Sequence, residues 1–278
     1  MENIRPRRSV LFMPGSNARA MEKARTLSCD VVVLDLEDAV APEVKEAARA
    51  AVCAAASARG FGHKEVVVRI NPLSSTWGAE DFKDVVKAKP DAVILPKVQS
   101  AADVTEARKR TADLDLWAMI ETPGAVLNAS AIAAAGAQCL VLGSNDLSKD
   151  LRAQDLPGRE NLWTTMSLVV LAARAHGISA IDGTHNDIAD KAGLDAACHQ
   201  ARAFGFEGKS LIHPDQIEAA NRAFAPSTEE IAAALSIQAA FARNPQASVL
   251  SLEGRMLERL HAEEAARILA LANAIQKK

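Results

Sequence analysis

Residues 31 to 40 read VVVLDLEDAV, an apolar run of β-branched side chains that ends in the three carboxylates Asp35, Glu37 and Asp38. Such a run predicts a strand buried on both faces, as in a parallel sheet. Alternate residues of a strand share a face, so Asp35 and Glu37 point to one side while the leucines beside them pack on the other. Buried acids need a cation, a hydrogen-bond donor or access to water. The stretch therefore predicts an α/β fold with an acidic cluster at one strand end.

Seven other short β-rich runs alternate with Ala-rich helical stretches along most of the chain, which is the pattern of repeated βα units. Eight strands match a (β/α)8 barrel, whereas a doubly wound sheet usually has about five or six. The 278 residues are enough for such a barrel, which commonly needs about 250. The expected strands are SVLFMPG from Ser9, VVVLDLEDA from Val31, EVVVRIN from Glu65, AVILPKV from Ala92, DLWAMIET from Asp115, CLVLGSNDL from Cys139, GISAIDG from Gly177 and GKSLIHP from Gly208.

The alternation of strands and helices stops near Pro226. A Ser-Thr pair after this proline can cap a helix that runs to about Arg243, VLSLEGRM predicts a short strand or hairpin, and AEEAARILALANAIQKK predicts a terminal helix. We therefore expect a barrel domain over residues 1–225 and a helical C-terminal extension over residues 226–278.

Composition excludes several classes of partner. The hydrophobic content of 49% is that of an ordinary globular protein, and the net charge of −3 gives no support for binding nucleic acid or an anionic membrane. No apolar stretch approaches the roughly 20 residues of a membrane span, and the N-terminus does not resemble a signal peptide, so a cytoplasmic location is expected. The cysteines lack disulfide or zinc spacing and are expected to be reduced packing residues; they are Cys29, Cys53, Cys139 and Cys198.

In a (β/α)8 barrel the carboxyl ends of the strands surround the active site. Every expected strand here ends in polar or turn-forming residues, and acids together with Arg and Lys on one rim predict an anionic substrate held through a divalent metal. These residues are Pro14, Gly15 and Ser16; Asp35, Glu37 and Asp38; Arg69 and Asn71; Lys97; Glu121 and Thr122; Asn145 and Asp146; Asp182; and His213.

Two of these acids, Glu121 and Asp146, follow neighbouring strands and are the expected metal ligands. Mg²⁺ prefers oxygen ligands and usually takes one or two protein carboxylates, leaving its other positions to water and substrate. Either acid alone is as readily explained as a helix cap or a rim salt bridge. Their joint placement with Arg69 favours a metal site, with Mg²⁺ as the expected cation and Mn²⁺ as the alternative.

The basic groups of this rim have two interpretations each. Arg69 has a planar fork that matches a carboxylate or a developing enolate oxygen, and it can equally pair with Glu37. Lys97 can be a structural ion-pair partner of the same acids. The backbone N–H groups of Gly124 and Ala125, which open a helix, offer a place for a substrate carboxylate.

Other catalytic classes have little support. His213 precedes a proline at a strand end, where a hydrogen-bonded structural role is more common than a role as a base. The chain has no nucleophile elbow, P-loop or dinucleotide-binding motif, so nucleophilic hydrolase, nucleotidase and dinucleotide-dependent functions lose their main support.

Taken together and in order, several motifs resemble the citrate lyase β-subunit-like and malyl-CoA lyase family, which are CoA ester lyases of the phosphoenolpyruvate/pyruvate-type barrel superfamily. The motifs are RSVLFMPGSNARAMEKA, LDLEDAVAPEVKEAAR, VRIN, ILPKV, IETPGA, LGSNDLS and GFEGKSLIHPDQI. The resemblance covers residues 7 to about 225 and continues more weakly to the end. It implies a TIM barrel that binds Mg²⁺ and cleaves or forms a carbon–carbon bond between an oxo acid and an acyl-CoA.

The resemblance also implies roles for individual residues. It makes Glu121 and Asp146 the metal ligands and Arg69 the contact to a substrate oxygen. It implies that Phe12 and Lys23 contact the CoA ester and that the backbone around Asn145 forms part of the substrate pocket. The groups expected around the metal, where they hydrogen-bond its waters and orient Arg69, are Glu37, Asp38 and Lys97.

The implied reaction is a retro-Claisen cleavage of a 3-hydroxyacyl-CoA such as malyl-CoA, citramalyl-CoA or citryl-CoA, in which Arg69 stabilises the enolate oxygen. In related lyases an Asp from the C-terminal lid of a neighbouring subunit protonates the enolate, and the matching position in GRMLERLH is Glu258, with Glu253 as a lesser candidate. The extra methylene could misplace the proton by about an ångström, at a cost on the order of 10²-fold. Glu258 can equally be a solvated charge on an amphipathic segment. A lid of this kind implies a homotrimer or a hexamer.

Three other functions remain open at this point. A malyl-CoA-type thioesterase shares the metal site but delivers water to the thioester. A class II oxo-acid aldolase needs no CoA. A subunit of a citrate lyase complex presents its site to an acyl-carrier partner instead of acting alone.

Overall fold

The computed structural model describes residues 4–111, 114–154 and 156–277. It divides into two compact units, one of which is Arg7–Phe224 and the other Ala225–Lys278 together with the N-terminal residues up to Pro6. Each unit is described by itself.

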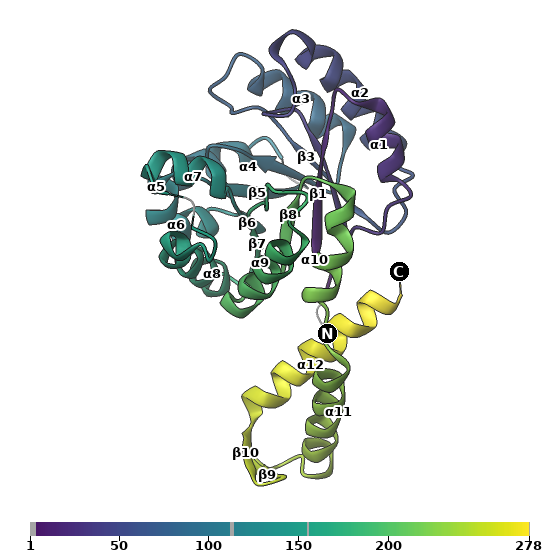
Figure 1. Cartoon of the computed structure of the whole chain (residues 1–278), viewed down its shortest axis with the longest axis vertical. Coiled ribbons are helices and arrows are strands. Elements are labelled where there is room, and N and C mark those ends of the chain that lie inside the picture. The colour runs from purple at the N-terminus through teal and green to yellow at the C-terminus, as the bar shows by residue number, and fades with distance from the viewer. Residues whose placement is uncertain (1–3, 112–113, 155, 278) are drawn as a thin grey trace. The chain divides into compact units, whose positions relative to one another are not determined.

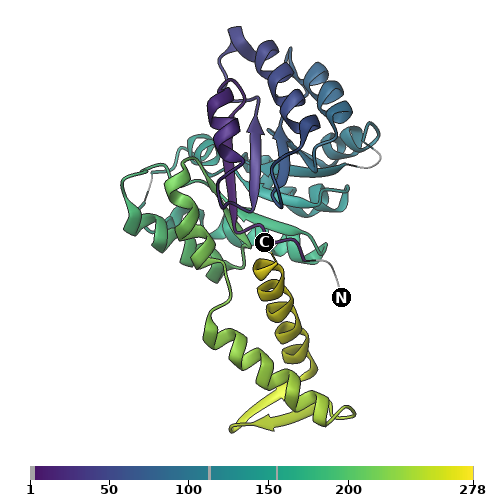
Figure 2. The ribbon, with the colours of Figure 1, turned by 90° about the vertical axis from the view of Figure 1, so that its right-hand side faces the viewer.

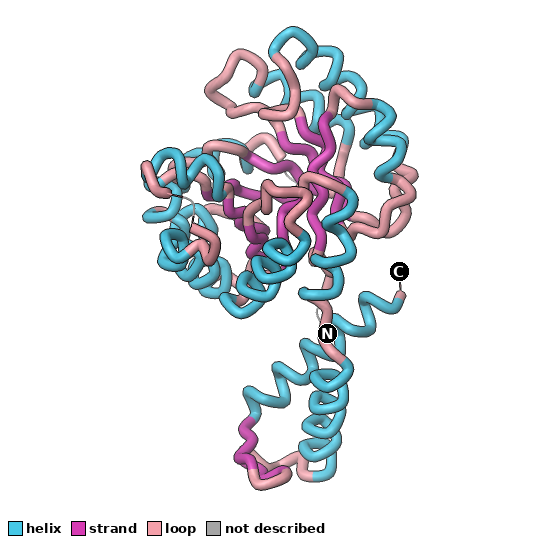
Figure 3. The backbone as a smooth tube through the Cα atoms, viewed as in Figure 1, coloured by secondary structure: helices cyan, strands magenta, loops and turns pink. Residues whose placement is uncertain are grey.

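The Arg7–Phe224 unit is a closed barrel of eight parallel strands that neighbour one another in chain order (Figures 1 and 3). The predicted (β/α)8 barrel is confirmed, and seven strands begin at the expected residue. β7 begins two residues late because Gly177 adopts a φ of 65° in the turn before it. The strands are β1 (Ser9–Pro14), β2 (Val31–Asp35), β3 (Glu65–Arg69), β4 (Ala92–Leu95), β5 (Asp115–Ile120), β6 (Cys139–Leu142), β7 (Ser179–Asp182) and β8 (Gly208–Leu211).

Helices connect successive strands and cover the outside of the barrel. They are α1 (Ala18–Ala24), α2 (Lys45–Ala58), α3 (Gly78–Ala88), α4 (Ala101–Arg108), α5 (Pro123–Leu127), α6 (Ala129–Ala134), α7 (Ser144–Leu151), α8 (Trp163–Ala175), α9 (Lys191–Phe204) and α10 (Ile217–Ala223), with 3-10 turns at Pro42–Val44, Glu160–Leu162 and Pro214–Gln216.

The apolar core has two parts that follow from strand alternation. The larger part lies between strands and helices and includes Leu34 and Leu36, as their position beside the acids predicted. The smaller part fills the barrel interior with β-branched side chains and the fully buried Trp117. Because the interior is filled, the barrel is a packed core rather than a pore, and polar chemistry is confined to its rims.

Buried ion pairs hold the end of the barrel where the strands begin. Arg8 donates two parallel hydrogen bonds of 2.8 and 2.9 Å to Asp30, and Arg7 donates two of 2.8 Å to Glu65. Bidentate pairs of this kind are geometrically specific. These four charged residues at the starts of the strands therefore stabilise the fold by pairing with one another.

Asp182, whose place at a strand end made it a candidate rim residue, faces outward toward α9. Lys209 Nζ lies 2.6 Å from Asp182 Oδ2, and Arg159 Nη1 donates to both carboxylate oxygens at 3.0 and 2.8 Å. Asp182 and Lys209 are both fully buried. Asp182 therefore neutralises buried cations between strand and helix.

We expect Asp182→Asn to destabilise the protein by about 3 kcal/mol or more, because it leaves the buried Lys209 without a carboxylate. Urea unfolding measures the loss. Because Asp182 does not line the cavity described below, the catalytic rate per folded molecule should stay unchanged. An equally stable variant would contradict this role.

The C-terminal unit is a helical hairpin whose helices pack side by side (Figure 2). It consists of α11 (Thr228–Arg243), the antiparallel strands β9 (Val249–Leu252) and β10 (Arg255–Glu258), and α12 (Arg259–Gln276). Ser227 caps α11, since its Oγ accepts from the N–H of Glu230 at 3.1 Å. The two-residue turn between the strands has positive φ at Glu253 and Gly254, which suits a tight hairpin.

Among the described residues, none of the helices is both long and apolar enough to cross a membrane.

Candidate functional site

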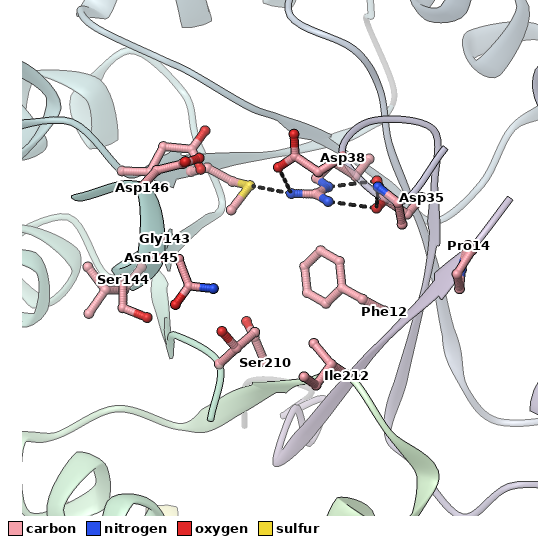
Figure 4. A pocket seen from close by; sticks show the side chains of 16 residues that line it. Phe12, Pro14, Asp35, Asp38, Gly143, Ser144, Asn145, Asp146, Ser210 and Ile212 are labelled. Carbon is pink, nitrogen blue, oxygen red and sulfur yellow. Dashed lines mark hydrogen bonds and ion pairs between the residues drawn. The ribbon is translucent and has the colours of Figure 1, made fainter. Parts of the chain in front are cut away.

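A cavity of about 400 Å³ opens at the carboxyl ends of the barrel strands (Figure 4). Its position is the one where barrel enzymes keep their active sites. Its walls combine acids, one arginine and apolar side chains, which is the usual make-up of a small-molecule site. The lining residues are Phe12, Pro14, Asp35, Asp38, Ala39, Arg69, Met119, Glu121, Leu142, Gly143, Ser144, Asn145, Asp146, Thr184, Ser210 and Ile212.

Arg69 is held in the cavity wall by the acids of the opening motif. Its Nε and Nη2 donate to the two oxygens of Asp35 at 2.7 and 2.6 Å, and its Nη1 lies 2.8 Å from Glu37 Oε2 and 3.7 Å from Asp38 Oδ2. Asp35 and Arg69 face each other because they are register partners on β2 and β3. The expected contact to Glu37 is present, and Asp35 provides a stronger, two-pronged contact.

The guanidinium of Arg69 also lies over the ring of Phe12, whose centroid is 5.1 Å from Arg69 Cζ. Burial alone disfavours the charged form, but the carboxylate of Asp35, followed by Glu37 and Asp38, raises the pKa of Arg69 above its usual value. Arg69 is therefore a permanently charged group with a fixed orientation, suited to an oxygen that becomes negative during a reaction.

Glu37 is almost completely buried. Burial raises its pKa to about 8, against the opposite effect of Arg69 and with a further increase from Asp38. A carboxyl group whose pKa lies close to neutrality beside a cavity is a feature of functional sites.

Glu121 follows β5 and is fixed by two backbone features. Its Oε1 accepts a hydrogen bond of 2.6 Å from the backbone N–H of Lys97. The backbone at Lys97 bends, with a φ of 53°. Gly143 provides room for the carboxylate, since a Cβ there would lie 2.7 Å from Glu121 Oε2. Burial, more than any neighbouring charge, raises the pKa of Glu121, so the ionised form needs a cation nearby.

A cationic centre already lies between the two expected metal ligands. Lys97 Nζ contacts Asp146 Oδ2 and lies 3.6 Å from Glu121 Oε1. At this rim, two basic side chains of the described chain, Arg69 and Lys97, pair with five acidic side chains, Asp35, Glu37, Asp38, Glu121 and Asp146. This surplus of acidic over basic side chains fits a divalent cation held by Glu121 and Asp146, with water and a ligand completing its shell. Among the residues described, no three Asp, Glu, His or Cys side chains are grouped as a complete metal cage.

The start of α7 forms the wall next to Asp146, where Gly143, Ser144 and Asn145 line the cavity. Asn145 therefore lies on the cavity wall, and its part in a substrate pocket stays a prediction. Its side chain exchanges hydrogen bonds of 3.2 and 2.9 Å with Asn186.

The expected carboxylate site at Gly124 and Ala125 is wrong. The N–H of Ala125 is bonded to the hydroxyl of Thr122, which caps α5, at 3.1 Å, and neither residue lines the cavity. The helix start that does face the cavity is that of α7.

Three other candidates are not among the residues that line this cavity. Lys23 is an exposed residue of α1. His213 caps a 3-10 turn, since its Nδ1 accepts from the N–H of Asp215 at 3.2 Å, which is the structural role expected. Glu258 is the N-cap residue of α12 in the C-terminal unit, where its own N–H donates to His261 Nδ1 at 3.0 Å.

Sequence reasoning missed the apolar and small residues of the walls. They are Met119, Leu142, Ser144, Thr184, Ser210 and Ile212. Strand alternation could have found Met119, Ser210 and Ile212, which continue the barrel-facing positions of β5 and β8, but not the others, since Leu142 belongs to the layer between strands and helices.

A closed parallel barrel with several acids and an arginine around a cavity on its carboxyl rim is the arrangement of a barrel enzyme. A family model described as HpcH/HpaI aldolase/citrate lyase matches residues 8–214, so the chain belongs to the HpcH/HpaI aldolase/citrate lyase family. The resemblance to citrate lyase β-subunit-like proteins is thereby confirmed.

Individual relatives cover nearly the whole chain. The chain is 43% identical to a (3S)-malyl-CoA thioesterase from Cereibacter sphaeroides, covering 97% of this chain and 96% of that protein. It is 34% identical to a citrate lyase subunit beta from Leuconostoc mesenteroides subsp. cremoris, covering 99% and 96%. Among solved structures, CitE from Mycobacterium tuberculosis in complex with magnesium, acetoacetate and coenzyme A has a TM-score of 0.80 at 33% identity, covering 96% of this chain and 98% of that one.

Proposed function

We propose that this protein is a Mg²⁺-dependent carbon–carbon lyase that cleaves the CoA ester of a 3-hydroxy acid bearing a free carboxylate into an oxo acid and a smaller acyl-CoA. The observation that carries the proposal is the placement of Arg69 and the Glu121–Asp146 pair on the same cavity. The relatives support the cofactor and the ligand class, since CitE is solved with magnesium together with coenzyme A and acetoacetate, and also with oxaloacetate.

Glu121 and Asp146 would hold the cation. Mg²⁺ bound there supplies charge that favours loss of the proton from a substrate hydroxyl. The hydrogen bond from the N–H of Lys97 and the absence of a side chain at Gly143 fix the position of the Glu121 carboxylate. This position determines where the hydroxy acid would bind.

Arg69 would act on the other end of the breaking bond. When the bond between the second and third carbons breaks, its electron pair moves onto the thioester carbonyl and gives an enolate. A guanidinium already fixed by Asp35 and Glu37 can meet this oxygen without reorganising, which is the condition for strong electrostatic catalysis. Asp35, Glu37 and Asp38 thus position Arg69 rather than bind the metal.

The enolate must then take up a proton to become the product acyl-CoA. We assign this step to Glu258, supplied by the C-terminal unit of a neighbouring copy in a homotrimer or hexamer. The chain supports this with an acid at the start of α12, next to a short hairpin. Glu258→Gln should lower kcat on the true substrate, and a fully active variant would remove Glu258 from the mechanism.

A thioesterase reaction is the second candidate, because relatives that are 43% identical carry the name (3S)-malyl-CoA thioesterase. In that reaction water attacks the thioester carbonyl, and Arg69 would stabilise the oxygen of the tetrahedral intermediate. The same cavity can therefore support either reaction.

Product analysis separates the two candidates. The purified protein is incubated with Mg²⁺ and with malyl-CoA, citramalyl-CoA or citryl-CoA, and the products are identified by mass spectrometry. An oxo acid with acetyl-CoA supports the lyase, whereas free CoA with an intact hydroxy acid supports the thioesterase. Turnover of free aldol substrates without CoA would support an aldolase instead, and activity only with an added acyl-carrier protein would support a complex subunit.

We expect Gly143→Ala to weaken Mg²⁺ binding about 10- to 100-fold, comparable to the loss of a group that orients a metal ligand. The new Cβ would lie 2.4 Å from the Cβ of Glu121 and must displace this side chain. The backbone at Gly143, with φ −94°, tolerates alanine, so the effect is local. Calorimetric titration with MgCl₂ measures it, and unchanged affinity would contradict the placement of Glu121.

A further inference from the structure

Ser210 lies in β8 and faces the interior of the barrel. Its neighbours Lys209 and Leu211 point outward, the first to Asp182 and the second into the layer between strands and helices. Strand alternation therefore directs Ser210 inward, where it lines the cavity on the side formed by Phe12 and Ile212 (Figure 4).

The hydroxyl of Ser210 is buried and has no hydrogen-bond partner among the described residues. The residue as a whole is only 2% exposed. A buried hydroxyl that bonds to nothing is unfavourable, and in native proteins such a group calls for an explanation. Because Ser210 lines the cavity, an oxygen of a ligand bound there is a partner that the site can offer to this hydroxyl.

Several other polar side chains of the cavity are already engaged. Arg69 is bonded to Asp35 and paired with Glu37, while the side chains of Asn145 and Thr184 both bond to Asn186. Ser210 differs from these groups because its donor and its lone pairs are unused within the described chain.

We propose that Ser210 is a substrate-binding residue whose hydroxyl donates a hydrogen bond to an oxygen of the acyl part of the CoA ester, and that it thereby contributes to selectivity for oxygen-rich acyl groups. This rests on the proposed function for the class of ligand, and it adds a recognition group on the wall that Phe12 and Ile212 make apolar. Ser210 contacts neither Arg69 nor the expected metal ligands through a hydrogen bond among the described residues.

The test compares Ser210→Ala with Thr111→Val, a matched control. The hydroxyl of Thr111 is also buried and unpartnered in the described chain, but Thr111 precedes β5 and does not line the cavity. For each protein the melting temperature is recorded with Mg²⁺ alone and across titrations with oxaloacetate, pyruvate and acetoacetate. The kcat/KM is measured on the best CoA ester.

We expect Ser210→Ala to weaken binding of the preferred oxo acid and to lower kcat/KM about tenfold, the effect of one lost hydrogen bond to a charged or polar ligand. Its melting temperature without ligand should be unchanged or higher, because an unsatisfied buried group is removed. Thr111→Val should leave binding and kcat/KM unchanged. A purely structural role for Ser210 would instead lower the melting temperature and spare binding.

Unchanged oxo-acid binding in Ser210→Ala overturns the proposal, as does a wild-type protein that none of these oxo acids stabilises. The proposed function fails on a different result, namely when wild-type protein binds an oxo acid but cleaves or hydrolyses none of the CoA esters. In that case the binding titrations alone still decide the role of Ser210.

Discussion

Glu121→Gln is expected to lower kcat/KM by on the order of 10³-fold and to abolish stabilisation of the protein by Mg²⁺. A metal ion contributes several kcal/mol to the stabilisation of charge in such reactions, and each 1.36 kcal/mol corresponds to about tenfold in rate. The glutamine keeps the size of the side chain and can still accept the hydrogen bond from the N–H of Lys97. The change therefore removes the charge of the ligand and little else.

The same variant makes a prediction for the metal-free protein. Because burial raises the pKa of Glu121 in spite of the nearby Lys97, its charged form is costly without a metal ion. The neutral amide removes this cost, so metal-free Glu121→Gln should melt at the same temperature as the wild type or higher. Glu106→Gln is the control, since Glu106 is an exposed residue paired with Lys109 and Arg110 outside the cavity. Unchanged Mg²⁺ affinity in Glu121→Gln would contradict the metal site.

Arg69→Lys is expected to lower kcat/KM by on the order of 10²-fold, as when one donor to a developing oxyanion is lost. Lysine keeps the positive charge but cannot make the two parallel bonds to Asp35 and face Glu37 at once. Those buried carboxylates are then partly unpaired, so the melting temperature should fall as well. Steady-state kinetics on the cleaved ester and thermal unfolding measure the two effects.

Arg8→Lys separates catalysis from stability. Arg8 also makes a buried two-pronged contact, to Asp30, but at the end of the barrel opposite the cavity. We expect it to lower the melting temperature in the same way and to leave kcat/KM unchanged. If both arginine variants lost activity equally, the effect of Arg69→Lys would be structural and Arg69 would not stabilise the enolate.

The fold was predictable from the sequence because hydrophobic patterning sets it. Eight β-rich runs between helical stretches leave few arrangements other than a barrel, and the alternation in VVVLDLEDAV already separates the inward acids from the leucines of the outer layer. The capped helix and hairpin of the tail follow equally from local signals, Ser227 before α11 and the turn at Glu253 and Gly254.

The site was predictable only in part, because contacts between strands depend on register and backbone geometry. The sequence pointed to Glu37 as the partner of Arg69, whereas the register of β2 and β3 also places Asp35 directly opposite. The turn that directs the N–H of Lys97 at Glu121 has no recognisable motif. The mistaken carboxylate site at Ala125 could have been recognised from the sequence, because a threonine before a proline is a typical helix cap. The hydroxyl of Thr122 accepts the hydrogen bond of the Ala125 N–H.

The cluster that ends VVVLDLEDAV has a role different from the one that its density of acids suggests. Asp35, Glu37 and Asp38 surround Arg69, while the cation position lies on the other side of the cavity between Glu121 and Asp146. The acids that follow one strand thus fix Arg69, and in the proposed function the acids that follow two other strands, Glu121 and Asp146, would hold the metal ion.

A crystal structure of the protein with Mg²⁺ and oxaloacetate tests this division most directly. The account predicts one Mg²⁺ bound by Glu121 and Asp146, with Lys97 Nζ moved away from Asp146, with oxaloacetate completing the metal shell and with Arg69 still held by Asp35. Mg²⁺ bound instead by Asp35, Glu37 or Asp38, or oxaloacetate bound outside this cavity, would contradict it.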